Sequence, residues 1–336
     1  MLIYPSGDSL SFTQRLGGRH VGKYLLRRLI FLVWILIAVS IICFMIIHLL
    51  PGSPSEAILG TGWTPQGAAL LNKQLGLDQP LIMQYLTWLG HVLTLNFGQD
   101  YITQTSIAST LKVALPPTIE LVVLSQLISL GLAIPVATFA ALRPNKLFDK
   151  LANLGSFGLL SVPTYVIITL LYIPITQWLN VPNSGTASYV PMSQGFLTNL
   201  ESLLIPIVAL SIGSFVVYFR VFRADLISTL QEEYITMARS KGISRRRILF
   251  RHAYRPSSVA LISTIGVNMA GLVTGTFIAE QVAAVPGIGS SLVGAIFQPD
   301  YQLLQAIVLV TATIVIVVNF GLDLLTGYID PRISRD

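Results

Sequence analysis

The residues from Gly17 to Tyr24 come closest to a catalytic motif, because they nearly match a loop that cradles nucleotide phosphates. That pattern, GxxxxGK followed by Ser or Thr, uses the hydroxyl group to hold magnesium, and Tyr24 occupies its place. A phosphate loop also lies between a strand and a helix, whereas here no strand precedes the motif and a long apolar run follows it. We therefore predict that this chain has no nucleotide site of its own.

Histidine, cysteine and carboxylate side chains are too scattered to form a metal or catalytic centre. No two histidines have the spacing HxxxH, and the single cysteine, Cys43, excludes an intramolecular disulfide and a multi-cysteine metal site. His48 has no acidic neighbour in sequence, which argues against an intramembrane protease. Glu120 and Asp323 lie near the ends of apolar runs, whereas an ion-coupled carrier normally needs a carboxylate nearer the membrane midplane. We predict no catalytic residue, no metal ligand and no enzymatic activity.

The composition identifies lipid as the solvent for much of the chain. Of its 336 residues, 53% are hydrophobic and only 11% are charged. A soluble domain carries roughly 25% charged residues, because it must cover a surface that faces water. The net charge of +6 comes from basic residues spread between apolar runs, without a basic domain, which argues against nucleic acid as a partner. The sequence predicts an all-α membrane protein.

Six apolar stretches are long enough to cross a bilayer as helices, which takes about 20 residues each. Prolines interrupt the third, at Pro163 and Pro174. If the N-terminus is cytoplasmic, all of the 21 Lys and Arg residues except Lys73 and Lys112 lie on the inner side, which predicts N-in, C-in topology. The expected spans are Leu29–Leu50, Thr118–Leu142, Leu151–Leu171, Leu203–Phe219, Ser257–Ala279 and Leu303–Leu325.

These spans divide the chain into four parts. Residues 1–28 form a cytoplasmic tail, residues 29–50 the first span, residues 51–117 an external segment, and residues 118–335 a core with the other five spans. The first apolar run is about 22 residues long, more than the 7–15 of a signal peptide, so we predict a retained helix. The external segment has apolar residues in helical spacing, and we expect it to be partly folded.

The cytoplasmic loop 220–256 is the most informative segment. We predict a short helix from about Glu232 to Ser240, with Tyr234, Ala238 and Lys241 on one face. Gly242 supplies a C-terminal cap with a positive φ, and Ser244 is expected to cap a second helix. Taken on charge alone, this is a solvated basic loop. The apolar and small residues of two amphipathic helices instead indicate a surface that docks another protein.

Residues Glu233–Ile243, which read EYITMARSKGI, resemble the coupling segment of ABC importer permeases, closest to the dipeptide and oligopeptide branch. Further motifs of that branch follow the same order along nearly the whole chain. Ser53, Asp100, Pro256, Ala260 and Ala283 depart from the usual residues, which leaves the substrate class open. The similar motifs are Tyr24–Leu29, His48–Gly52, Leu75–Asp78, Asn96–Gly98, Leu115–Leu121, Glu280, Pro286–Gly289, Asp300, Tyr301, Asn319, Asp323 and Asp330–Ile333.

The resemblance implies a type I ABC importer permease fold with six transmembrane helices, in a bacterial cytoplasmic membrane. It further implies peptide import with a second homologous permease, two ATPase subunits that bind ATP and magnesium, and an extracytoplasmic substrate-binding protein that meets the external segment. The implied coupling residues are Glu233, Tyr234, Met237, Ala238, Lys241, Gly242 and Ile243. Transport of nickel or another small solute in the same class, and a secondary transporter working alone, remain alternatives.

Two residues of the fifth span and its outer end are candidates for the translocation path. Asn268 lies among small residues that permit close helix packing, so it either contacts a neighbouring helix or lines a water-filled path. Glu280 is expected at the outer mouth, where it could meet the substrate or the binding protein.

Overall fold

The computed structural model describes residues 18–49, 55, 59, 62–74, 76–100, 103–178, 189–298 and 300–329. Within these ranges, regular structure is helical apart from one isolated antiparallel bridge between Gln99 and Ser106. Five helices are long and apolar enough to cross a membrane, or six if one bent pair counts as a single span. Helices suit this solvent because they satisfy their backbone hydrogen bonds internally. The predicted all-α membrane fold is confirmed.

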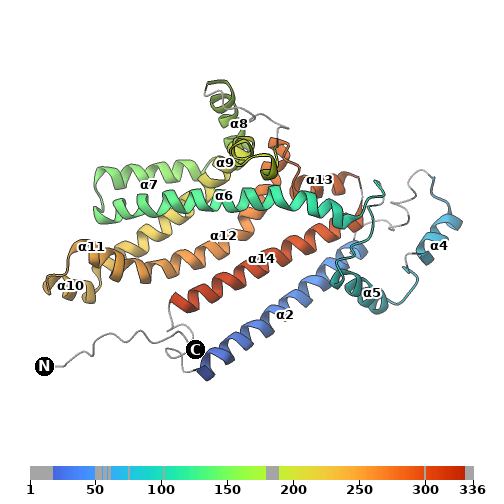
Figure 1. Ribbon diagram of the computed structural model, residues 1–336, viewed down its shortest axis with the longest axis horizontal. Helices are drawn as coiled ribbons and strands as arrows, with labels where there is room; N and C mark the ends of the chain where they lie inside the picture. The colour runs from blue at the N-terminus through green and yellow to red at the C-terminus, as the bar shows by residue number, and fades with distance from the viewer. Residues whose placement is uncertain are drawn as a thin grey trace.

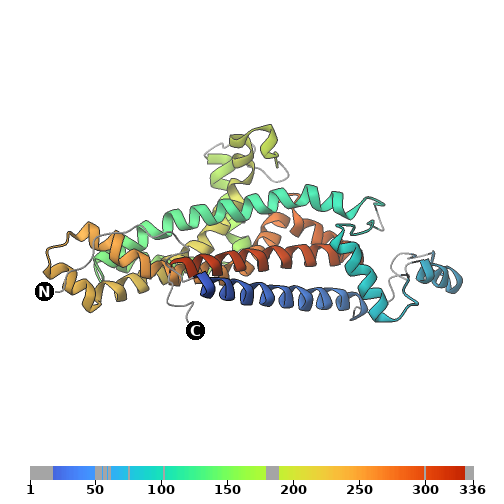
Figure 2. The ribbon, with the colours of Figure 1, turned by 60° about the horizontal axis from the view of Figure 1, so that its bottom comes forward.

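The long helices lie side by side in an elongated bundle (Figure 1). They are α2 (Gly18–Leu49), α6 (Ile107–Leu142), α9 (Phe196–Gln231), α12 (Tyr254–Ala283) and α14 (Tyr301–Ile329). The short helices α10 (Glu233–Ser240) and α11 (Arg245–Arg247) lie at one extremity. Helix α4 (Pro65–Gln74) lies at the opposite extremity, with α5 (Leu81–Leu93) and α13 (Ile288–Phe297) towards the same end (Figures 1 and 2).

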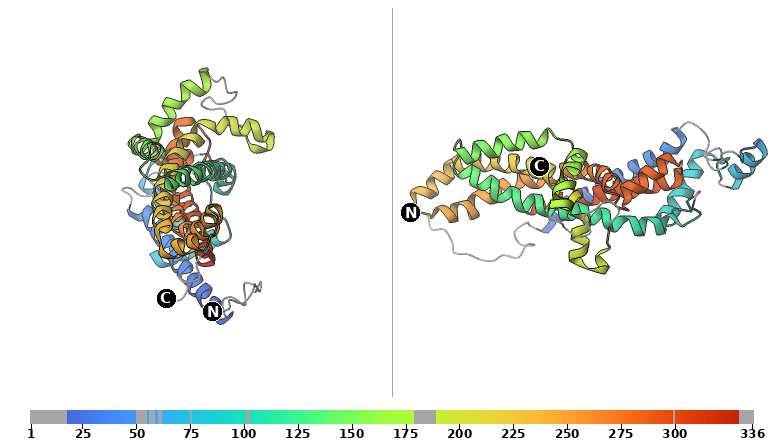
Figure 3. Two further views of the ribbon diagram at one scale, coloured as in Figure 1. Left: turned by 90° about the vertical axis from the view of Figure 1, so that its left-hand side faces the viewer. Right: turned by 90° about the horizontal axis from the view of Figure 1, so that it is seen from above.

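The third expected span, Leu151–Leu171, is broken in the structure. Helix α7 (Leu147–Leu160) ends before Pro163, and α8 (Thr164–Ile173) then sets off at 103° to it. Because proline lacks an N–H group and disfavours a helical conformation in the residue before it, the break falls where the sequence has Pro163. Helix α8 projects out of the bundle in Figures 1 and 2 and in the left-hand view of Figure 3.

The other helices are longer than the apolar runs that predicted them. Helix α6 begins at Ile107 rather than Thr118, with Pro116 and Pro117 inside it, and α9 continues to Gln231, well beyond the expected end at Phe219. The loop expected from residue 220 therefore begins only after Gln231. An apolar run marks the part of a helix that meets lipid, whereas the helix itself continues as long as its backbone bonds are made.

The centre of the bundle is the contact between α6 and α9. The Ser129 hydroxyl donates to the Ser211 carbonyl at 2.9 Å, and the Ser211 hydroxyl donates to the Ser125 carbonyl at 3.2 Å. Farther along, Ala133 and Ala137 of α6 are fully buried against the aromatic side chains of α9. Small residues let membrane helices approach closely enough for such backbone contacts. The paired helices α6 and α9 form a rigid unit, and the short helix α10 follows directly after the end of α9.

Candidate functional site: a cytoplasmic elbow

The chain turns sharply between α9 and α12, and we call residues 232–253 the elbow. Glu232 is extended (φ −62°, ψ 148°) and separates α9 from α10. Gly242 has φ +75°, as predicted, and two backbone hydrogen bonds close the end of α10 around it. The Gly242 N–H donates to the Arg239 carbonyl at 3.0 Å, and the Ile243 N–H to the Ala238 carbonyl at 3.2 Å. This is the Schellman arrangement, in which glycine takes the left-handed position most easily.

The second half of the elbow differs from the expected second helix. Ser244 makes no side-chain capping bond, so the predicted cap is wrong. The helix α11 has only three residues and passes through a π-helical turn, Ile248–Ala253, directly into α12. The elbow thus consists of one separate short helix, α10, and a helical segment, residues 245–253, that continues directly into α12. We call this segment the stalk.

A small apolar core holds α10 against this stalk. Ile235 is fully buried, and Ala238 and Ile248 are nearly so. Leu230 of α9 and Ile243 pack against them. The Ile243–Ala238 contact is the apolar pair that accompanies a Schellman motif. The elbow is therefore a packed unit that has its own core, rather than a solvated basic loop.

The predicted coupling residues divide between this core and the surface. Tyr234, Met237 and Lys241, spaced i, i+3 and i+7, are exposed, the first two at 45% and 58%. Glu233 and Gly242 are exposed as well. Ala238 is only 8% exposed and faces inward with Ile243, so it does not share the outward face of Tyr234 that the spacing predicted. Helical periodicity predicts which residues share a face of the helix, but it does not predict which part of the protein that face contacts.

The exposed tyrosine remains neutral. Partial burial raises the pKa of the Tyr234 hydroxyl, and the carboxylates of Glu232 and Asp225 raise it further. An uncharged phenol beside an apolar Met237 offers a mixed apolar and hydrogen-bonding surface. Such a surface fits a groove on another protein better than it fits bulk water.

Tyr254 ties the elbow to three helices, which the sequence did not reveal. Its hydroxyl lies 2.6 Å from the Thr138 hydroxyl of α6, and its ring packs edge-on against Phe222 of α9 at 5.4 Å. The ring of Phe250, in the π-helical turn, also packs edge-on against Tyr254, with ring centroids 5.0 Å apart. Movement of the elbow therefore reaches α6, α9 and α12 together.

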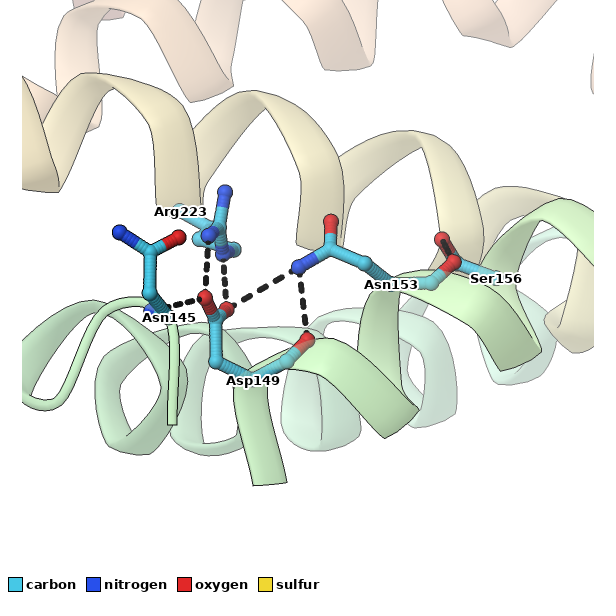
Figure 4. Close-up of polar contacts among 5 residues, drawn as sticks. All are labelled: Asn145, Asp149, Asn153, Ser156 and Arg223. Atoms are coloured by element: carbon cyan, nitrogen blue, oxygen red, sulfur yellow. Dashed lines mark hydrogen bonds and ion pairs between the residues drawn. The ribbon is translucent and has the colours of Figure 1, made fainter. Parts of the chain in front are cut away.

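A buried ion pair fastens α7 to the same end of α9 (Figure 4). Arg223 donates to both carboxylate oxygens of Asp149, at 2.5 and 2.6 Å. The Asn145 N–H and the Asn153 amide donate to the same carboxylate at 2.8 and 3.0 Å. Asp149 is almost completely buried, and these four donors satisfy its carboxylate. In sequence, Arg223 was counted only as one of many cytoplasmic basic residues.

Asn268 lies between helices. Its amide donates to the Ser214 hydroxyl at 3.1 Å and to the Tyr218 hydroxyl at 3.0 Å, both on α9. The Tyr218 hydroxyl in turn donates to Gln126 of α6 at 2.8 Å. The structure thus shows the helix contact, one of the two roles expected for Asn268.

Glu280 is fully buried, and the structure does not place it at an open mouth. Its carboxylate accepts from the Thr118 hydroxyl of α6 at 2.6 Å, from the Gly289 N–H at 2.6 Å and from the Ser290 N–H at 3.2 Å. A Cβ on Gly287 would lie within 2.5 Å of this carboxylate. Glu280 therefore caps α13 and fixes it to the outer ends of α6 and α12.

In the described part of the chain, no group of three or more His, Cys, Asp or Glu residues could hold a metal ion.

Several residues of the resemblance, including Pro51–Ser53, Leu75 and Asp330–Ile333, lie outside the described residues, as do residues 1–17 of the tail. The division into tail, first span, external segment and core stays a prediction.

Comparison with known proteins covers nearly the entire chain. Residues 133–335 match the family described as the binding-protein-dependent transport system inner membrane component, and residues 21–122 match the N-terminal region of the same kind of membrane component. A probable peptide ABC transporter permease from Sinorhizobium fredii is 33% identical over 93% of this chain and 99% of its own length. A dipeptide transport permease from Lactococcus lactis is 31% identical over 93% of this chain and 99% of its own length.

Among solved structures, the inward-facing MetNI methionine ABC transporter gives a TM-score of 0.49 at 15% identity, over 64% of this chain and 93% of that one. The family match spans more than half of the chain and coincides with the part that carries the elbow. The chain belongs to the binding-protein-dependent transport system inner membrane components, the multi-pass permease subunits of ABC transporters.

Proposed function

We propose that this chain is the permease subunit of an ATP-driven importer that moves di- or oligopeptides into the cytoplasm. The proposal is supported by peptide permeases among the relatives, matched over nearly their full length, including a di/tripeptide permease from Pseudomonas aeruginosa at 30% identity. A second homologous permease, two ATPases and an extracytoplasmic binding protein complete the transporter. ATP and magnesium are bound, and ATP is hydrolysed, by the ATPases and not by this chain.

The observation that carries the mechanism is the split of the elbow into an inward core and an outward face. Because Ile235, Ala238 and Ile248 pack α10 onto the stalk, force on the exposed Tyr234 and Met237 moves the whole unit. An ATPase that grips this face and closes on ATP displaces α9 and α12 and opens the pathway outward by rigid-body rocking. Lys241 adds an exposed charge, worth at most about 1 kcal/mol to docking.

Crosslinking tests the docking face directly. A Met237→Cys variant is made in a Cys43→Ser background, since Cys43 is the only cysteine. We expect a short thiol crosslinker to join residue 237 to an ATP-hydrolysing subunit in the assembled transporter. Leu70→Cys is the matched control, because Leu70 is 66% exposed but lies on α4 at the opposite end, and it should give no such product. Absence of the product from residue 237 would refute the docking role.

Reconstitution tests the cargo and the division of labour. Proteoliposomes that contain all subunits, with the ATPases facing the lumen, should take up a labelled tripeptide only when ATP is enclosed in the lumen. They should not take up nickel. The purified chain alone should move neither. Uptake by the chain alone, driven by an ion gradient, would instead identify a secondary transporter.

A further inference from the structure

Helix α5 presents an apolar side that no described element covers. Ile82 and Leu93 are 75% and 77% exposed, and Leu86 is also well exposed. At 100° per residue, Leu89, Ile82, Leu93 and Leu86 follow one another around one sector of the helix. Thr87 and His91 lie in a separate, polar sector.

The third sector of α5 faces α2. The Tyr85 hydroxyl lies 2.8 Å from the Ser40 hydroxyl of α2, and the rings of Tyr85 and Trp88 pack on Phe44 at 5.5 and 5.7 Å. Nearer the end of α2, His48 bonds to Gln84 at 3.3 Å. Thus α5 has one side for protein, one apolar side and one polar side.

These contacts fix the depth of α5 in the membrane. The apolar part of α2 is Leu26–Ile46, whose 21 residues match a hydrocarbon layer about 30 Å thick. Ser40 precedes Ile46 by six residues, which places it about 9 Å inside that layer at a rise of 1.5 Å per residue. The Tyr85 hydroxyl reaches this level, so the backbone of α5 lies within one tyrosine side chain of it. In Figure 2, α5 lies across the end of α2 rather than along it, so the helix does not leave the membrane again within its length.

We propose that α5 is an interfacial helix whose sector of Ile82, Leu86, Leu89 and Leu93 is embedded in the acyl chains of the outer leaflet. Near the same end of α2, Ile41 and Ile42 are also exposed, at 46% and 61%. A helix at this depth with an uncharged apolar sector and a polar one lies in the plane of the interface. Tyrosine and tryptophan are enriched at membrane–water interfaces, and α5 carries Tyr85 and Trp88. The inference rests on membrane insertion alone and is independent of the cargo.

Site-directed spin labelling in the assembled transporter in lipid nanodiscs tests this arrangement. Single cysteines in the Cys43→Ser background replace Ile82 and Leu93 in the apolar sector, and Thr87 and His91 as matched controls. We expect labels at 82 and 93 to collide with dissolved oxygen and to be shielded several-fold from a water-soluble nickel chelate. Labels at 87 and 91 should show the reverse.

Any one of three results would overturn the proposal. Equal access of the chelate to all four labels would place α5 in water. Exclusion of both reagents from residues 82 and 93 would show that a binding protein or the second permease covers this sector. The native complex provides a test without mutation: a carbene probe dissolved in the bilayer should label the α5 peptide more than the α4 peptide. Equal labelling of the two peptides would also count against lipid contact.

Discussion

Truncation of Ile235 to alanine should loosen the elbow without unfolding the membrane helices. The Ile235 side chain has no exposed surface, and it belongs to a small apolar core with Leu230, Ala238, Ile243 and Ile248. Replacing a buried isoleucine by alanine costs about 2–5 kcal/mol, and we take 2–3 kcal/mol because a peripheral core can partly collapse. At 1.4 kcal/mol per factor of ten, the open population of the elbow rises roughly 30- to 140-fold.

Hydrogen exchange of the assembled transporter measures this directly. The amide of Ile243, bonded to the Ala238 carbonyl, and the amide of Ile248, bonded to the Ser244 carbonyl, report opening of the elbow. Both should exchange faster by the factor above in Ile235→Ala, and ATP-dependent uptake should fall.

Tyr234→Ala is the matched control, because it truncates a neighbouring side chain on the exposed face. Its exchange should stay within about twofold of the parent, since surface substitutions rarely cost more than about 0.5 kcal/mol, while its uptake still falls. If exchange in Ile235→Ala does not change, or if both variants accelerate it equally, the division between core and docking face is wrong.

Other positions give further tests. Gly242→Ala should destabilise the elbow by about 1 kcal/mol, because its φ of +75° favours glycine, and Gly242→Asn should restore most of the loss in the same exchange assay. Gly289→Ala should lower the yield of detergent-stable protein several-fold, since its Cβ would lie 2.3 Å from the Phe277 Cα. An unchanged yield would show that α12 and α13 are not packed this closely. Asp149→Asn leaves Arg223 without its buried carboxylate and should lower stability by about 3 kcal/mol in thermal denaturation, more than Asp149→Leu combined with Arg223→Leu.

The glycine-centred end of α10 could be predicted from the sequence, because a left-handed turn leaves a local signal in residue types. Gly242 follows eight helix-compatible residues, and both the helix and the positive φ are present. The positions of Ala238 and Glu280 could not be predicted. Each faces inward because of partners far away in sequence or beyond the turn, such as Ile248 and Thr118, and periodicity carries no information about such partners.

The spans were predicted by apolar length, but their ends were not. Apolarity reports where lipid lies, and α9 continues twelve residues beyond Phe219, with Phe222 and Leu226 buried in the core that α9 shares with α6 and α12. The break in the third span follows from Pro163, yet its 103° angle depends on tertiary packing that the sequence does not reveal. The ion pair between Asp149 and Arg223 joins two separate helices, so neither residue type indicated it.

The cap that Glu280 places on α13 limits how this end of the molecule can change shape. Swinging α13 away would break the hydrogen bonds that the buried Glu280 carboxylate accepts from the two backbone amides of α13. The tips of α6, α12 and α13 must then travel as one solid piece. In the proposed importer, we therefore expect an outer gate to open where this piece meets a second permease subunit, and not by bending within the chain.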